Sequence, residues 1–307
     1  MHLKFILYIK YNMSSVIVQP QVANIMNAVM CGLMSFGLLM TPQKFMQGGQ
    51  YQQPWFSNIP ENRDNRVFHI SQFMGFLMLG GCVVPTLINP NSQFLCYQMA
   101  IIHGINLVHS LVFMCSNAYK NAKPTQFSSK CQWYFMNVVS LIWFLVTCLA
   151  CVHSTPNVID SGETYISKAV ANTVMVAFTS IFGVLFVLVP RHMLSTFWED
   201  EGQEGGPSFM GFRLIDMTDL EYWWARCVGT TILGLNLGLL VDLNISQPLY
   251  TASSLVTIST LTLLNFHEVV MRQYKSISTK QVLMSWLPNL AMSGVVIGVL
   301  VSALLYV

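Results

Sequence analysis

Polar side chains recur along the apolar run Phe94–Cys115, at spacings that a helix would bring onto one face. His103, Asn106 and Ser110 follow one another by three and four residues, and His109 lies beside them. Polar groups in the hydrocarbon of a bilayer are costly unless they are satisfied, so this face is expected to point into a helical bundle. Such a stripe could line a path for a ligand or an ion, or it could hold neighbouring helices together by hydrogen bonds.

Hydroxyl and amide groups form a second stripe in the later runs. Thr257 and Thr260 lie one helical turn apart, and Asn236 lies near the middle of the preceding run. If the two stripes face each other, they could line one polar cavity near the middle of the membrane. The candidate ligand-binding residues are therefore His103, Asn106, His109, Ser110, Asn236, Thr257 and Thr260.

Histidine could also ligate a haem or another pigment. A bis-histidine haem needs two imidazoles at the same depth on facing helices, and simple counting finds no such pair for His103 or His109. Cys148, Cys151 and His153 follow at close spacing, but a structural zinc site needs four ligands and no second cluster accompanies them. No metal and no cofactor is therefore expected, with a haem or pigment kept as an alternative.

Acidic residues are almost absent from the apolar runs. Asp242 and Glu268 are expected at the edges of their runs, and no pair of carboxylates occurs inside one, so a proton-coupled pump is not supported. The nucleotide-binding and hydrolase motifs G-x-x-x-x-G-K-[ST], G-x-G-x-x-G and G-x-S-x-G are missing. A non-enzymatic protein is therefore expected.

The composition explains why polar residues inside these runs stand out. Of the 307 residues, 53% are hydrophobic and 9% are charged, against about 25% charged residues in an ordinary soluble domain. A membrane helix needs about 20 mostly apolar residues. Eight runs meet this requirement: Val22–Met40, Ile70–Ile88, Phe94–Cys115, Trp133–Val152, Ala169–Val189, Tyr222–Leu243, Leu249–Val270 and Leu283–Val307. The predicted fold class is all-α, a polytopic protein with about eight transmembrane helices in a lipid bilayer.

A net charge of +2 excludes the dense basic surface that binding of nucleic acid requires.

The distribution of basic residues gives the orientation. Twelve of the fifteen Lys and Arg residues fall on the side of the two long loops, and cytoplasmic loops collect positive charge. Both termini are therefore expected on the non-cytoplasmic side of a membrane whose identity stays open. The two N-x-[ST] sequons, at Asn12 and Asn244, fall on that side as well. Translation could begin at Met1 or at Met13.

Matching residues recur at fixed distances along the chain. An offset of 148 places Asn24 on Asn172, and an offset of 154 places Gly75 on Gly229, Gly80 on Gly234, His103 on Thr257 and Asn106 on Thr260. The chain is therefore predicted to hold an N-terminal segment (1–21), a first four-span repeat (22–153), an outer linker (154–168) and a second four-span repeat (169–307). Because each repeat crosses the membrane an even number of times, the two would share one orientation about an axis along the membrane normal.

Each repeat ends its first run with a proline and a basic residue, Pro42 with Lys44 and Pro190 with Arg191. The second repeat adds the motif W-x-R-x-x-G at 224–229, whereas Gln72 occupies the arginine position of the first repeat. In these features each repeat resembles the DoxX-like and related uncharacterised four-span membrane proteins. The resemblance implies a four-helix bundle for each repeat, and it implies no particular activity because that grouping is functionally diverse.

These observations favour a non-enzymatic membrane protein that binds or transports a small molecule, an ion or a lipid between two four-helix halves. One alternative is an accessory or structural subunit of a larger membrane complex, or a homo-oligomer, with aromatic residues of the long loops as docking surfaces. The other alternative is a redox or pigment protein that uses His103 or His109 to hold a haem.

Overall fold

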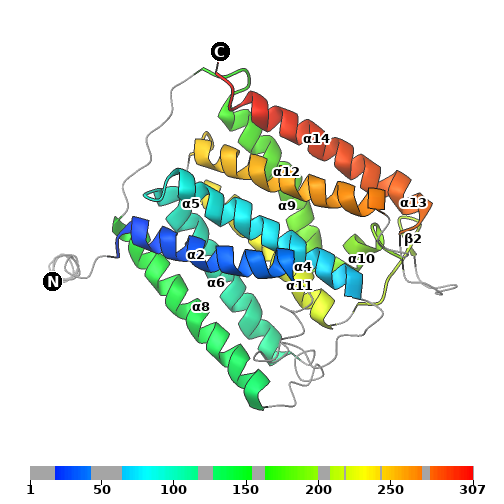
Figure 1. Cartoon of the computed structure of the whole chain (residues 1–307), viewed down its shortest axis with the longest axis horizontal. Coiled ribbons are helices and arrows are strands. Elements are labelled where there is room, and N and C mark those ends of the chain that lie inside the picture. The colour runs from blue at the N-terminus through cyan, green and yellow to red at the C-terminus, as the bar shows by residue number, and fades with distance from the viewer. Residues whose placement is uncertain are drawn as a thin grey trace, which may run out of the picture.

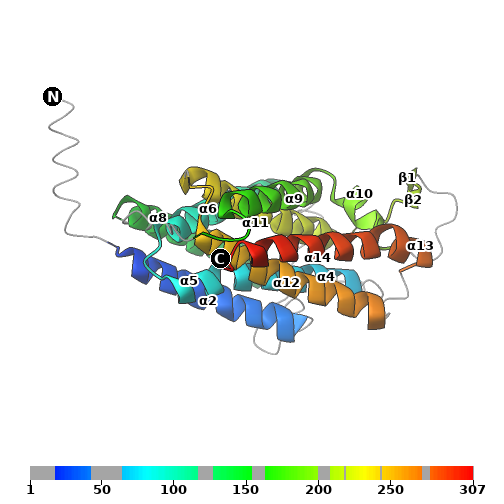
Figure 2. The ribbon, with the colours of Figure 1, turned by 90° about the horizontal axis from the view of Figure 1, so that it is seen from above.

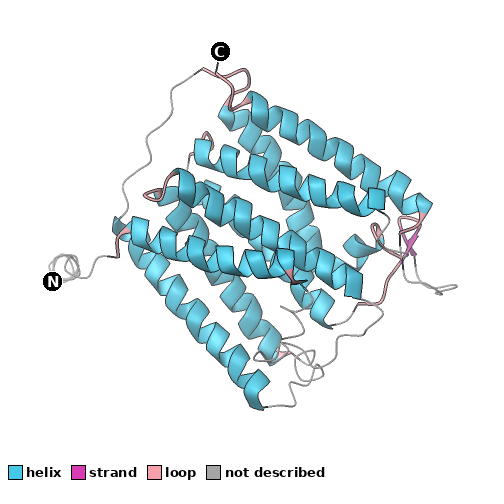
Figure 3. Ribbon diagram, viewed as in Figure 1, coloured by secondary structure: helices cyan, strands magenta, loops and turns pink. Residues whose placement is uncertain are grey.

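The structure, a computed structural model, describes residues 18–42, 64–116, 127–153, 163–199, 208–217, 219–242, 244–271 and 277–306. Helices account for almost all of them (Figures 1 and 3). Within these residues, eight helices are long and apolar enough to cross a membrane. The all-α polytopic fold predicted from the sequence is therefore confirmed.

The helices begin and end close to the predicted runs. In chain order the long elements are α2 (Pro20–Met40), α4 (Asp64–Met78) continued by η3 (Leu79–Val83) and α5 (Val84–Ile88), α6 (Gln93–Cys115), α8 (Phe127–His153), α9 (Lys168–Leu188), α11 (Asp219–Asp242), α12 (Pro248–Met271), and α13 (Thr279–Gln281) continued by η4 (Val282–Trp286) and α14 (Leu287–Ser302). A short helix, α10 (Pro190–Ser195), and a hairpin of β1 (Ser208–Phe209) and β2 (Phe212–Arg213) lie between α9 and α11. α2 and α9 end two residues before Pro42 and Pro190, because proline lacks the N–H that would extend each helix.

The bundle has two ends, which we call the terminal face and the loop face. α2 begins and α14 ends at the terminal face, toward the left of Figure 1, whereas α2 ends and α11 begins at the loop face. Seen from above, α2 and α12 lie on one side of the bundle, and α6 and α9 lie on the other (Figure 2). α4 and α11 lie between these two sides.

α4 and α11 form the centre of the bundle. Their apolar windows are 56% and 67% buried, against 44% or less for the other spans. α11 packs against α4, α6 and α9, while α4 and η3 pack against α2 and α12. Glycine permits these contacts: a Cβ atom on Gly80 would lie 2.9 Å from the Cα atom of Thr257, and one on Gly234 would lie 2.7 Å from the side chain of Ile102. Larger residues there would push two spans apart.

Two spans contain a π turn next to a proline. η3 runs into α5 just before Pro85, and η4 runs into α14 just before Pro288. In η3 the N–H of Val84 bonds to the carbonyl of Leu79, five residues back, and η4 makes the equivalent bond. The wider turn keeps each helix hydrogen-bonded across a residue that has no N–H to donate.

An asparagine fastens α2 to the turn between α5 and α6 at the terminal face. Asn24 is buried, and its Nδ2 donates to the carbonyls of Pro90 and Ser92 at 2.8 and 3.1 Å. Its Oδ1 accepts from the Sγ atom of Cys96 at 3.5 Å. One side chain thus ties three consecutive elements together.

The same arrangement holds α9 to the turn between α11 and α12. Asn172 is buried, and its Nδ2 donates to the carbonyls of Ile245 and Gln247 at 2.7 and 3.1 Å, while its Oδ1 accepts from the hydroxyl of Thr251 at 2.8 Å. These three partners each lie 155 residues after their counterparts around Asn24. The two turns therefore match at an offset of 155, one more than the offset of 154 that the sequence suggests for this part of the chain.

Candidate ligand-binding cavities

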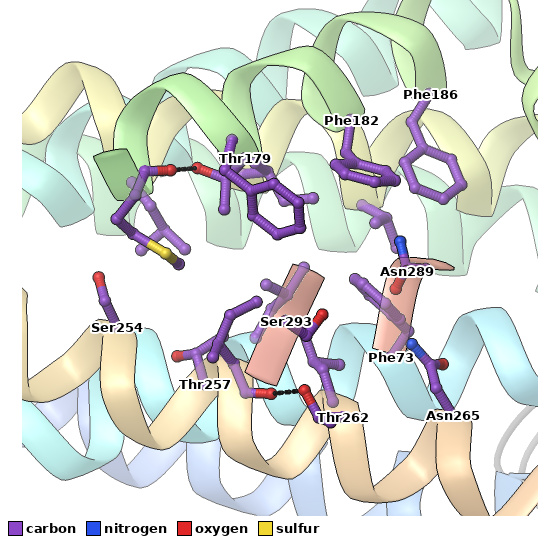
Figure 4. Close-up of a pocket in the computed structure, with 18 of the residues that line it drawn as sticks. Phe73, Thr179, Phe182, Phe186, Ser254, Thr257, Thr262, Asn265, Asn289 and Ser293 are labelled. Carbon is purple, nitrogen blue, oxygen red and sulfur yellow. Dashed lines mark hydrogen bonds between the residues drawn. The ribbon is translucent and has the colours of Figure 1, made fainter. Parts of the chain in front are cut away.

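Two internal cavities stand out in the described part of the bundle, one on each side of the central helices. The methionine cavity has a volume of about 170 Å³ and lies among α2, α4, α6, α8 and α11. The asparagine cavity has a volume of about 100 Å³ and lies among α4, α9, α11, α12 and α14 (Figure 4). Each is larger than the roughly 10–15 Å³ that a single water molecule needs.

Asn236 organises the hydrogen bonds on one side of the asparagine cavity. Its Nδ2 donates to the hydroxyls of Thr179 and Ser180, at 2.9 Å each, and its Oδ1 accepts from the hydroxyl of Tyr250 at 2.7 Å. These bonds join α11 to α9 and α12. The amide of Asn236 is therefore satisfied within the protein, and it fixes the position of the cavity wall.

Two further amides face this cavity. Asn265 of α12 and Asn289 of α14 line it and are half-buried, and Figure 4 labels both among the residues around the cavity. Neither side chain makes a hydrogen bond with any residue that the structure describes. These two amides are therefore available to a molecule in the cavity.

Phenylalanine rings form the opposite wall. Phe178 and Phe182 of α9 meet edge to face, with centroids 5.1 Å apart, and Phe73 of α4 lies 6.3 Å from Phe186. All four line the cavity. An apolar wall thus faces amides that have hydrogen-bonding capacity to spare, which is typical of small-molecule sites.

Sulfur-containing side chains dominate the methionine cavity. Its lining includes Met30, Met34, Met74, Met78, Met99, Met136, Cys31, Cys82 and Cys227. Two of the polar groups that line it are engaged with neighbouring helices: His103 bonds to Asn27 of α2, and Asn106 accepts from the hydroxyl of Thr230 of α11 at 2.8 Å. In this cavity the polar stripe of α6 therefore joins helices.

The single polar cavity that the sequence suggests is divided in two. The methionine cavity is lined by His103, Asn106 and Ser110, and the asparagine cavity is lined by Asn236 and Thr257. The division arises because the central helices touch: a Cβ atom on Gly81 would lie 2.7 Å from the side chain of Leu235. Residues on either side of this contact cannot share one space.

His109 and Thr260 line neither cavity. The Nδ1 atom of His109 lies 3.6 Å from the Sγ atom of Cys227, and its ring stacks on Trp223 at 6.3 Å. Thr260 donates to carbonyls of its own helix. Among the described residues, no three His, Cys, Asp or Glu side chains come together as a metal site, and the side chain of His153 lies outside that part of the chain.

Residues that line the methionine cavity correspond to residues that line the asparagine cavity at a fixed distance along the chain for each pair of helices. The offset is 148 from α2 to α9, 154 from α4 to α11, 155 from α6 to α12 and 153 from α8 to α14. Matching pairs include Met34 and Phe182, Cys82 and Asn236, Ser110 and Asn265, Trp133 and Trp286, Met136 and Asn289, and Ser140 and Ser293. In this register Thr257 corresponds to Ile102, so the predicted match of His103 with Thr257 is one residue out of step.

Glu268 lies near the end of its span, as the sequence predicts, and it is buried there. Its exposed fraction is 2%, and it faces His69, which lines the asparagine cavity. The helical spacing of Leu261, Asn265 and Glu268, by four and three residues, is the signal that could have placed all three on one face. The burial itself depends on packing at the loop face, which an apolar run does not reveal.

The two cavities are the features of the described chain that could bind a ligand. Comparison of the chain with protein-family models, with curated proteins and with solved structures finds no match in any of the three.

Proposed function

We propose that this protein binds a small amphipathic molecule inside the membrane, in the asparagine cavity. The observation that carries the proposal is the pair of amides of Asn265 and Asn289, which line the cavity without a hydrogen bond to any described residue. Both side chains are half-buried, and in the hydrocarbon of a bilayer a polar group without a partner is costly. A ligand that bonds to either amide removes that cost.

The rest of the lining indicates what the ligand must offer. Phe73, Phe182 and Phe186 provide an aromatic wall for an apolar body, and Asn265 and Asn289 provide donors and acceptors for a polar group. No permanently charged Lys or Arg side chain lines the cavity within the described residues. The ligand class is therefore an uncharged or weakly polar molecule of lipid-like solubility.

Hydrogen bonds fasten α14 to neighbouring segments at both faces, which favours access from the side. At the terminal face the N–H of Ile166 donates to the carbonyl of Ser302 at 3.3 Å, and at the loop face the indole N–H of Trp286 donates to the carbonyl of Phe197 at 2.9 Å. Asn289 on α14 is partly exposed between these ends. A molecule dissolved in the bilayer can reach it there without crossing the loop face.

We further propose that the two cavities descend from two four-span halves, as the internal repeat in the sequence predicts. The paired asparagine contacts at Asn24 and Asn172 and the matched cavity linings support this proposal. The DoxX-like resemblance of each half, transport between the halves and a non-cytoplasmic location of both termini belong to the same proposal. Membership of a larger membrane complex and haem binding by His103 or His109 stay predictions from the sequence.

The binding proposal is tested by native mass spectrometry of the protein extracted from its own membrane in a mild detergent. We expect a small molecule that remains bound to the wild type. Asn265→Leu and Asn289→Leu should lose it, because leucine keeps the branched shape of asparagine and removes its hydrogen bonds.

The matched cavity provides the controls. Ser110→Ala and Met136→Leu change the positions that correspond to Asn265 and Asn289 in the methionine cavity, and both should retain the bound molecule. The proposal is wrong if the wild type carries nothing beyond bulk lipid, or if the asparagine variants retain the molecule as the wild type does.

A further inference from the structure

Glu268 is a buried carboxylate near the loop face, on the same face of α12 as Asn265. Its side chain is 3% exposed, and its Oε1 lies 3.9 Å from Nδ1 of His69 and 3.7 Å from Nδ1 of His267. Its Oε2 has no hydrogen-bond partner among the described residues. The two imidazoles are therefore the described groups within reach that can balance its charge.

His69 lies at the loop-face end of the asparagine cavity. It lines the cavity, its side chain is 3% exposed, and its ring meets the rings of Trp198 and Trp286 edge-on at 5.2 and 5.8 Å. His267, by contrast, is 52% exposed. The carboxylate of Glu268 thus shares a dry aromatic environment with one imidazole and touches solvent only through the other.

The permanent charges on the neighbouring elements are engaged elsewhere. Arg66, one turn before His69 on α4, lies 2.9 Å from the carboxylate of Glu221 on α11. Arg191 of α10 bonds to Asp216, Lys280 of α13 donates to the carbonyl of Gly211, and His192 of α10 lies outside the cavity lining. η4 contributes the uncharged ring of Trp286. No Lys or Arg within the described residues therefore forms an ion pair with Glu268.

Burial of an unbalanced charge is strongly unfavourable, and an imidazole can balance a carboxylate only while it carries a proton. We propose that His69 and Glu268 form a proton-binding site at the end of the asparagine cavity, in which one proton, carried by the carboxylate or by the imidazole 3.9 Å away, keeps the buried pair neutral. Loss of this proton would leave a buried negative charge. The site goes beyond ligand binding, and it stands whether or not a ligand of the cavity is found.

The matching position beside the methionine cavity is filled without a histidine or a glutamate. At the same offsets, Phe113, Trp223 and Trp133 take the places of Glu268, His69 and Trp286. Their rings pack together with centroid distances of 5.3 to 6.4 Å. Packing at this position therefore does not require a histidine and a glutamate, and their presence beside the asparagine cavity calls for a chemical reason.

The test is the pH dependence of tryptophan fluorescence in the purified full-length protein. A protonated imidazole quenches an indole that it contacts, so Trp198 and Trp286 report the charge of His69. We expect a pH transition in the wild type that is absent from His69→Gln. In Glu268→Gln the midpoint should differ from that of the wild type, because the carboxylate that faces the imidazole is gone.

His267→Gln is the matched control, since it removes the exposed imidazole beside Glu268 and leaves His69 against Trp198 and Trp286, so the fluorescence transition should persist in it. An unchanged transition in His69→Gln, or a wild-type midpoint in Glu268→Gln, overturns the proposal. Where Glu268→Gln does not fold, the double variant H69W/E268F installs the pair found at the matching position. It should fold and lose the transition, and a transition that persists in it overturns the proposal as well.

Discussion

His103 and Asn27 are joined across α6 and α2 by a hydrogen bond of 3.0 Å between Nε2 and Oδ1, and Asn27 donates in turn to Thr147 of α8 at 3.3 Å. Because the Nδ2 of Asn27 is used for Thr147, its Oδ1 is the acceptor and the Nε2 of His103 carries the hydrogen. His103→Leu should therefore lower the free energy of unfolding by about 1–3 kcal/mol. Thermal unfolding in detergent measures this. Loss of a bound ligand at unchanged stability would instead assign His103 to the ligand path considered from the sequence.

Gly80→Ala should destabilise the protein. A Cβ atom there would lie 2.1 Å from the hydroxyl oxygen and 2.9 Å from the Cα atom of Thr257, so backbone as well as side chain must move. Overpacking of this kind costs about 1–3 kcal/mol. Gly294→Ala is the control, because nothing lies within 4 Å of its Cβ position in the described chain and alanine favours a helix. Equal unfolding midpoints for the two variants would contradict the close packing of η3 on α12.

Asn24→Ala and Asn172→Ala should destabilise the protein to a similar extent. Each removes two bonds to turn carbonyls and leaves those carbonyls without the amide donor, at a cost of about 1–3 kcal/mol. Thermal unfolding of both variants beside Asn91→Ala, which changes an exposed residue of one turn, measures the effect. A large loss in one variant and none in the other would speak against equivalent roles.

Arg66 and Glu221 form a buried ion pair between the central helices, with side chains 5% and 0% exposed. Arg66→Met should cost about 3–5 kcal/mol, because it leaves the carboxylate of Glu221 buried without its cation. The double variant R66M/E221L should recover much of that stability, since neither charge then remains. Denaturation of the single and double variants forms the measurement, and a double variant less stable than R66M would refute the explanation.

The spans could be predicted from the sequence because a bilayer imposes a minimum apolar length on each helix. Pro42 and Pro190 likewise mark where α2 and α9 end, since the missing N–H acts locally. The hairpin of β1 and β2 was not predicted. It turns through Met210 and Gly211, both with positive φ, in a stretch with little apolar periodicity.

The cavities could be predicted only in part. The stripes containing His103 and Thr257 do line internal spaces, because polar groups in a membrane helix face the bundle. That these spaces are separate follows from the contact of Gly81 with Leu235, which depends on how α4 and α11 cross. The burial of Glu268 depends on long-range packing against α4, which its position near the end of an apolar run does not reveal.

Leu235 lines both cavities, as does Leu77, so the partition between them consists of side chains that belong to both. The absence of a side chain on Gly81 gives Leu235 the room it occupies. The size of either space therefore depends on the side chain at position 235, and a substitution there changes both halves of the bundle at once.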